Sequence, residues 1–185
     1  YAEVVLGPRA DDVAHPAFSN LFIETEYYGP HSALFARRRP RSAQDEPKWG
    51  VHVLSTSVET IAGIQFETDR NRFLGRGHTT AEPVAVMEDR PLSNTVGAVL
   101  DPIFSLRCRV RLMPNETAQV VFTTGVAPSR DAAIMLAEKY RDANIFERES
   151  RMAWIRAQVE MTHLHIDPNE AHLFQRLAGR ILYTD

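Results

Sequence analysis

The first two thirds of the chain carry apolar and polar patterns typical of β-strands. The clearest example is residues 104–112, where apolar residues fall at every second position and Arg107, Arg109 and Arg111 lie between them. Such period-two alternation predicts a strand with one face in a core and the other in solvent. A turn follows, and residues 118–126 then return as the expected antiparallel partner of a hairpin.

Shorter strand-like segments precede this hairpin, and each is rich in aromatic or β-branched residues. They are residues 18–28, 33–39, 49–54 and 64–68. Hairpins and short runs of this kind favour an antiparallel sandwich over a regular alternation of strands and helices. We therefore expect a β-sandwich over residues 1–127.

The apolar period changes to that of helices after the last expected strand. Ser129 is a suitable N-cap for a first helix, and residues 144–164 carry the apolar stripe of a second. The sequence Asp-Pro-Asn-Glu at residues 167–170 is the start signal of a third helix. We expect helices over residues 128–185, and their apolar stripes need either the sandwich or a following domain to pack on.

Composition narrows the classes of partner. The 185 residues carry a net charge of −3, which gives no field to recruit nucleic acid. A single cysteine, Cys108, excludes an intramolecular disulfide. No apolar run approaches the ~20 residues that cross a bilayer. We expect a soluble chain that does not bind nucleic acid.

The start of the chain bears on whether this is a whole protein. It begins at Tyr1 in an apolar, β-branched segment, without an initiator Met, a basic n-region or a signal cleavage site. This pattern predicts a piece cut from a longer polypeptide. The alternative is a processed but complete protein.

The common motifs for metals, cofactors and nucleophiles do not occur in the sequence. HExxH, GxSxG, Walker A and the dinucleotide fingerprint are all missing. The one close pair of histidines, His163 and His165, would point to different sides of a helix. We therefore expect no metal and no cofactor.

The most unusual segment is residues 67–77, where a strand runs into a loop dense in Asp, Arg and Gly around an exposed-looking aromatic residue, Phe73. Sugars are held by planar hydrogen-bonding groups together with an aromatic or apolar face, and these side chains supply both. The alternative is a turn pinned by an ion pair between Asp69 and an arginine, and residue chemistry alone favours it.

Two further groups of charges precede this segment. Glu24 and Glu26 lie on one face of an expected strand, close enough to shift each other's pKa as general acid catalysis requires. A basic cluster occupies residues 37–41. For both groups the alternative is a set of solvated surface charges, which the residues favour.

Several stretches of the chain resemble the cyclic β-1,2-glucan synthase family. They are residues 15–27, 67–77, 96–107, 121–126 and 173–178. The resemblance implies a large parent enzyme in the bacterial inner membrane, with this region on the cytoplasmic side. Its N-terminal glycosyltransferase region builds glucan from UDP-glucose, and its C-terminal region resembles cellobiose and β-1,2-oligoglucan phosphorylases.

The resemblance also implies a fold and a role. Those phosphorylases have an antiparallel, galactose-mutarotase-like β-supersandwich, then linker helices, then an (α/α)6 barrel. Residues 1–127 would be part of the supersandwich and residues 128–185 the helical linker, with the barrel absent. The family's general acid and phosphate site lie in the barrel. We therefore expect no catalytic residue here, but a non-catalytic module that scaffolds the barrel and is inactive alone.

In related phosphorylases a loop of the sandwich domain approaches the substrate pocket, often that of a partner subunit. The Arg-x-Arg-Phe-Leu-Gly stretch resembles that loop. Arg70, Arg72 and Phe73 are therefore the candidate substrate-binding residues, with β-1,2-glucan as the ligand. The expected protein partners are the rest of the parent chain and a second copy. The alternative function is a free-standing carbohydrate-binding or protein-interaction β-sandwich domain.

Overall fold

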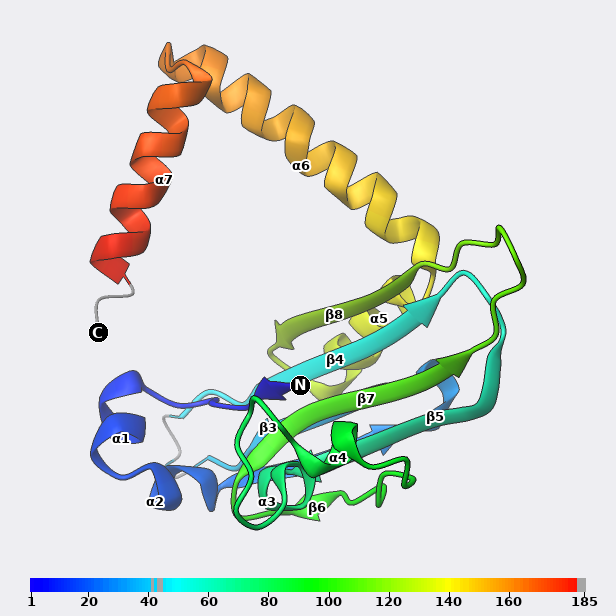
Figure 1. The fold of residues 1–185 in the computed structure, drawn as a ribbon. Coiled ribbons are helices and arrows are strands. Elements are labelled where there is room, and N and C mark those ends of the chain that lie inside the picture. The colour runs from blue at the N-terminus through cyan, green and yellow to red at the C-terminus, as the bar shows by residue number, and fades with distance from the viewer. Residues whose placement is uncertain (41, 43–44, 183–185) are drawn as a thin grey trace. The chain divides into compact units, whose positions relative to one another are not determined.

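The structure is a computed structural model that describes residues 1–40, 42 and 45–182. The chain divides into two compact units, Tyr1–Ala143 and Asn144–Asp185 (Figure 1). Within the described residues every strand lies in the first unit, and the second unit is helical.

Five strands form the larger sheet of the first unit in the order β6-β2-β3-β4-β8, and all neighbours are antiparallel. Their bounds are β2 Ile23–Tyr28, β3 Ala33–Arg38, β4 Lys48–Thr56, β6 Gly97–Ala98 and β8 Val120–Ala127. The strand expected over residues 18–28 begins only at Ile23. The residues before it form helix α2 (Pro16–Asn20), which Pro favours at its first position. Helix α1 (Arg9–Ala14) and the 3-10 turn η1 (Gly29–His31) are also short.

Three strands form the smaller sheet in the order β1-β7-β5. Their bounds are β1 Ala2–Glu3, β5 Thr60–Asp69 and β7 Pro102–Val110. The core between the two sheets consists of Val4, Ile23, Leu34, Ala36, Leu54, Phe66, Phe104 and Leu106. Because each large apolar side chain contributes about 1.5–3 kcal/mol on burial, this contact is what holds the sandwich together. The antiparallel sandwich expected from the sequence is present.

The prediction that residues 104–112 and 118–126 pair as a hairpin is wrong. β7 pairs with β1 and β5, whereas β8 pairs along its whole length with β4 in the other sheet. Alternation predicts that a segment is a strand, but it does not specify the partner strand. Arg107, expected on a solvent face, instead donates to Gln65 Oε1 at 2.6 Å and to the carbonyl of Ala85 at 2.7 Å.

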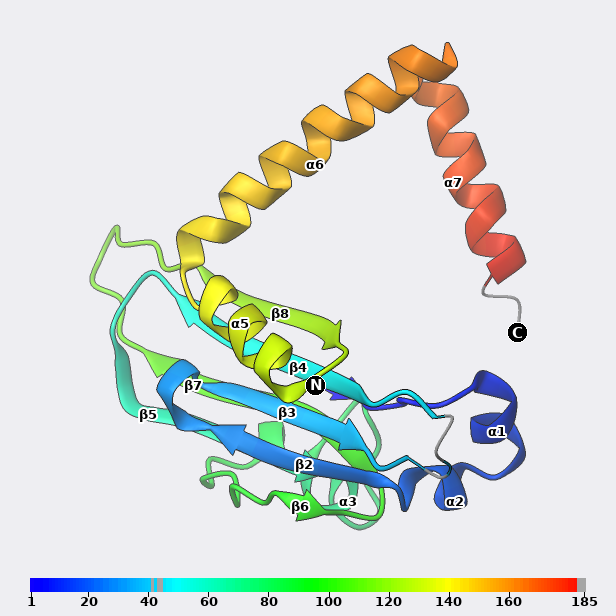
Figure 2. The same cartoon turned by 180° about the vertical axis from the view of Figure 1, so that it is seen from behind.

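Helix α5 (Arg130–Tyr140) covers the other face of the larger sheet (Figure 2). Ser129 caps this helix as predicted, because its Oγ accepts the amide of Ala132 at 3.1 Å. The core below α5 consists of Ala33, Phe35, Val51, Val53, Ala127, Ala133 and Ala137. The division into domains after residue 127 stays a prediction, and the structure adds that α5 packs with the strands.

The second unit is built from α6 (Ala143–Leu164) and α7 (Pro168–Leu182). A capping box starts α7 as predicted. The amides of Asn169 and Glu170 donate to Asp167 Oδ1 at 2.7 and 3.0 Å, and the amide of Asp167 donates to Glu170 Oε2 at 3.0 Å. No helix among the described residues is both long and apolar enough to cross a membrane.

Candidate functional site

The candidate segment at residues 67–77 forms the end of β5 and a one-turn helix, α3 (Arg70–Leu74), in place of the expected open loop. Asp69 caps this helix, because its Oδ1 accepts the amide of Asn71 at 2.9 Å. Gly75 ends the helix with a φ of 83°, in the left-handed region that favours glycine. These two ends fix the directions in which the candidate side chains leave the backbone.

A buried carboxylate holds the end of β5 beneath α3. Glu67 is 2% exposed, and its Oε1 accepts the amides of Thr68 and Asp69 at 3.0 Å each. Its Oε2 accepts the hydroxyl of Ser93, and the Thr68 hydroxyl donates to the carbonyl of Thr95 at 2.8 Å. Satisfied buried networks of this kind specify one local conformation. The network therefore gives α3 a fixed base.

Arg70 is turned back toward the strands. Its Nε donates to Tyr1 Oη at 3.1 Å and to Glu3 Oε1 at 3.3 Å, and its Nη1 lies 3.5 Å from Asp101 Oδ2. Burial raises the pKa of Asp101, and the charge of Arg70 opposes that rise. Arg70 thus ties α3 to β1 and to the turn before β7, with its charge already paired.

Arg72 and Phe73 have different surroundings. The Arg72 side chain is 60% exposed, and its Nε lies 3.7 Å from Asp69 Oδ2, which is the ion pair that the alternative interpretation expects. Phe73 was expected to be exposed, and this is wrong, because only 7% of it is exposed. A one-turn helix directs neighbouring side chains to different sides, and Phe73 is on the inner side. Its ring belongs to a small core with Leu74, Ala85, Leu92 and Ile103.

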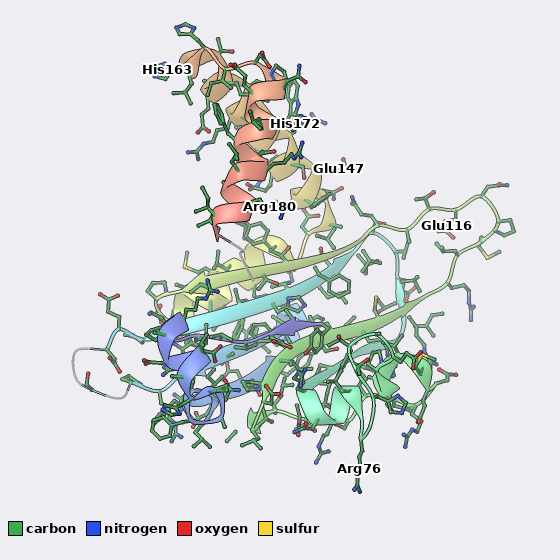
Figure 3. All side chains as sticks on the ribbon, turned by 60° about the vertical axis from the view of Figure 1, so that its left-hand side comes forward. Arg76, Glu116, Glu147, His163, His172 and Arg180 are labelled. Atoms are coloured by element: carbon green, nitrogen blue, oxygen red, sulfur yellow. The ribbon has the colours of Figure 1, made fainter. Side chains whose placement is uncertain are left out.

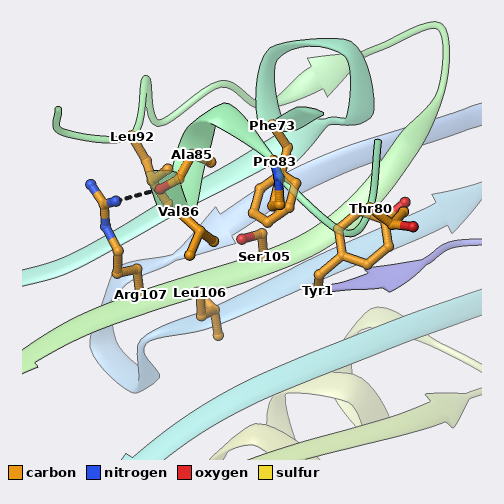
Figure 4. Close-up of a pocket in the computed structure, with 10 residues that line it drawn as sticks. All are labelled: Tyr1, Phe73, Thr80, Pro83, Ala85, Val86, Leu92, Ser105, Leu106 and Arg107. Atoms are coloured by element: carbon orange, nitrogen blue, oxygen red, sulfur yellow. Dashed lines mark hydrogen bonds between the residues drawn. The ribbon is translucent and has the colours of Figure 1, made fainter. Parts of the chain in front are cut away.

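A pocket of about 340 Å³ lies beside Phe73, among β7, α3 and helix α4 (Val84–Met87) (Figure 4). The ring of Tyr1 lies 5.0 Å from that of Phe73, so two aromatic rings form one wall. The lining residues are Tyr1, Phe73, Thr80, Pro83, Ala85, Val86, Leu92, Ser105, Leu106 and Arg107. Apolar walls with a few polar groups, in a cavity of this size, suit a small ligand with an apolar face.

The structure brings only one of the three candidate residues, Phe73, into this pocket. Arg72 lies on the exposed side of α3, and Arg76 in the following loop also extends into solvent (Figure 3). Sequence reasoning did not place Tyr1 or Arg107 beside this segment. They reach the pocket through the long-range pairing of β1 and β5 with β7, for which a local pattern gives no signal.

Comparisons with known proteins identify the family of this sandwich. Residues 1–143 match the family model described as glycosyl hydrolase 94, supersandwich domain. The chain belongs to this supersandwich family. All 185 residues align at 38% identity with cyclic beta-(1,2)-glucan synthase NdvB of Rhizobium meliloti (strain 1021), and they span 6% of that protein's length.

These matches confirm two expectations from the sequence. The resemblance to the cyclic β-1,2-glucan synthase family is confirmed by identity over the whole chain. The supersandwich followed by helices is confirmed by the family match and by the two antiparallel sheets. The match ends at Ala143, which is also the last residue of the first compact unit. The roles of Arg70, Arg72 and Phe73 in substrate binding stay predictions.

A second group of charges in the supersandwich domain is the pair Glu24 and Glu26, which point to one face of β2 as predicted. Each carboxylate is paired with an arginine, Arg37 at 2.6 Å from Glu24 and Arg130 at 2.9 Å from Glu26. Arg37 belongs to the basic cluster of the sequence, whose last member, Arg41, lies outside the described residues. The structure thus shows surface ion pairs at both groups of charges.

The described residues were also compared with what a metal site or a reactive thiol requires. In the part of the chain that the structure describes, no three His, Cys, Asp or Glu side chains are grouped to hold a metal ion. His163 and His172, on α6 and α7, are exposed (Figure 3). Burial raises the pKa of the Cys108 thiol, which lowers its fraction of reactive thiolate.

Proposed function

We propose that this chain is a non-catalytic, carbohydrate-associated module of a cyclic β-1,2-glucan synthase or glycoside phosphorylase-type enzyme. In that enzyme it scaffolds a helical catalytic barrel and contacts the glucan. The observation that carries the proposal is the 38% identity, over all 185 residues, to a cyclic beta-(1,2)-glucan synthase. The supersandwich match over residues 1–143 supports it.

The proposed glucan contact is made by the α3 segment, and its three residues have different roles. Arg72 is half exposed and holds Asp69 only loosely, at 3.7 Å, so its guanidinium is free to donate to sugar hydroxyls. Phe73 and the neighbouring ring of Tyr1 offer apolar ring surface in the adjoining pocket. Arg70, which is paired with Glu3 and Asp101, supports the contact by fixing α3.

The proposed scaffold role rests on the helices that follow the sandwich. Both α6 and α7 expose apolar side chains in the chain by itself, among them Trp154, Phe174, Leu177 and Ile181. Exposed stripes of this kind mark surfaces that another part of a protein covers. In this proposal the barrel of the same polypeptide covers them, a second copy is a further partner, and the whole enzyme sits in the bacterial inner membrane with this module on its cytoplasmic side.

Titration calorimetry with β-1,2-linked glucans tests the glucan contact, on this chain and on an enzyme that contains the barrel. We expect Arg72→Ala to weaken glucan binding about tenfold, because a hydrogen bond from a charged group is lost. Arg109→Ala is the matched control, since Arg109 is also half exposed and paired with one carboxylate, that of Asp89. Equal affinities for the two variants would reject the α3 contact. Turnover of glucan with phosphate by the purified chain alone would reject the non-catalytic role.

A further inference from the structure

A second depression lies on the other sheet of the sandwich, on the outer face near the start of α5. Figure 2 shows α5 lying across that face of the sheet. Its volume is about 380 Å³. Unlike the pocket beside Phe73, it has four charged side chains among its eight lining residues, together with one tryptophan. The lining residues are Glu24, Thr25, Glu26, Arg37, Trp49, Gly97, Ala98 and Arg130.

Strand register places these side chains next to one another. Glu24 pairs with Arg37 across β2 and β3, and Arg37 pairs with Trp49 across β3 and β4. These positions alternate with the residues of the core between the sheets, so they share the face that α5 covers. Because α5 begins only at Arg130, this end of the face lies beyond the helix. The edge strand β6, which pairs with Glu24, borders the depression.

The charges in the depression are balanced and half exposed. Arg37 Nη2 lies 2.6 Å from Glu24 Oε2, and Arg130 Nε lies 2.9 Å from Glu26 Oε1. The two carboxylates and two guanidinium groups that line the depression therefore sum to no net charge, and a third guanidinium group, that of Arg39, borders them with its Nε 3.3 Å from Glu24 Oε1. A charged ligand gains little from such a surface, since each attraction comes with a repulsion of similar size. A neutral ligand with many hydroxyl groups can donate to the carboxylates and accept from the guanidinium groups at once.

Trp49 adds the apolar surface that a sugar needs. It packs at the border of the core below α5 and is only half buried. An indole ring carries a large apolar face, and aromatic side chains beside convergent polar groups are typical of small-molecule sites. The combination of one such ring with two donor–acceptor pairs is what distinguishes this depression from an ordinary patch of surface ion pairs.

We propose that this depression is a second carbohydrate subsite, which binds a neutral sugar unit between Trp49 and the pairs Glu24–Arg37 and Glu26–Arg130. The class of ligand rests on the proposed function, but the subsite is separate from the α3 segment and is tested separately. A glucan chain long enough to touch both sites would bind more tightly than one that touches either alone.

Tryptophan fluorescence of the full chain tests this subsite directly. The chain has two tryptophans, and Trp154 is exposed on α6, so Trp154→Phe leaves Trp49 as the single indole reporter. Titration of this variant with a β-1,2-linked gluco-oligosaccharide is expected to change the Trp49 emission in a saturable way. Adding Arg130→Gln is expected to raise the dissociation constant about tenfold, because charge-assisted donors to the sugar are lost.

Matched controls separate this proposal from the proposed function. Arg109→Gln changes an equally exposed, singly paired arginine outside the depression, and it should leave the Trp49 titration unchanged. Arg72→Ala should also leave it unchanged with a short oligosaccharide. A silent Trp49 together with calorimetric glucan binding would overturn the subsite alone, while no glucan binding by either method would overturn both. An unchanged dissociation constant in the Arg130→Gln variant would also overturn the subsite. Tighter binding of glucuronate than of glucose oligomers would do the same.

Discussion

The two compact units of the chain differ in what holds them together. In the first, the larger sheet is buried on both faces, by the smaller sheet and by α5, and side chains such as Phe35 and Ile103 are fully covered. In the second, no described residue is buried, because Ala143, the one buried residue of α6, belongs to the first unit. Isolated helices of ordinary length are marginal in water. The first unit is therefore stabilised by its own core, whereas the described residues of the second have helix caps but no buried core.

The largest effect that tests this difference is the loss of a core ring in the first unit. Phe35→Ala should destabilise the chain by about 3–5 kcal/mol, because the ring is fully buried between β3 and α5 and leaves a cavity. Urea unfolding followed by circular dichroism measures this loss. The matched change in the second unit is Phe174→Ala, which should cost less than about 0.5 kcal/mol because half of that ring is exposed. Similar losses for the two variants would contradict the contrast between the units.

A buried histidine makes the first unit sensitive to acid. His52 lies on the inner face of β4, with its ring stacked 5.6 Å from Phe104 and 5.9 Å from Phe122. Its Nδ1 is 2.8 Å from Thr124 Oγ1, and its Nε2 is buried without a hydrogen-bond partner in the described structure. Burial, with a smaller contribution from the positive N-terminal amine, lowers the pKa of His52 to about 4.

This low pKa predicts how stability depends on pH. Since the folded pKa of His52 is about 4 and the ordinary value is 6.5, the unfolded chain binds the proton more readily. The contribution of neutral His52 is complete above pH 6.5 and is lost as the pH falls toward 4. One pKa unit corresponds to ~1.4 kcal/mol, so the loss is about 3 kcal/mol. Urea midpoints measured from pH 7 to pH 4 test this value.

Two variants isolate the histidine from other titrating groups. His52→Asn keeps a group able to bond to Thr124 but does not titrate, so its stability should fall less steeply below pH 6.5 than that of the unchanged chain. His172→Asn, on the exposed surface of α7, should keep the original slope. The interpretation fails if the slope is the same in all three proteins.

Much of the fold was predictable because its signals are local. The strand at residues 104–112, the Ser129 cap and the Asp167 capping box each depend on neighbours in sequence. The structure contains both caps and a strand at Pro102–Val110, although Ser105 on the expected solvent face of that strand is buried. Strand pairing is not local. The choice of β4 in place of β7 as the partner of β8 depends on which buried faces fit together, and no short window of sequence records that choice.

As with the fold, the local features of the candidate site were predictable and its long-range contacts were not. The α3 segment was recognised from its Asp, Arg and Gly content, and the Asp69–Arg72 ion pair follows from their spacing. The burial of Phe73 was not predictable, because it depends on Ile103 and Tyr1, which reach α3 only through β7 and β1. The depression at Trp49 likewise needs four strands and the start of α5 to assemble.

The smallest of these effects compares equivalent caps in the two units. Asp167→Ala and Ser129→Ala each remove a side chain that accepts helix amides, which costs about 1 kcal/mol. In the first unit this loss is spread over a cooperative core, so Ser129→Ala should lower the unfolding midpoint and leave far-ultraviolet circular dichroism at 25 °C unchanged. In the second unit no described residue belongs to a buried core that would oppose fraying, so Asp167→Ala should reduce the helical signal at 25 °C. If both variants shifted only the midpoint, α7 would belong to the same cooperative unit as the strands. Helix α7 could then fray only when the whole core unfolds.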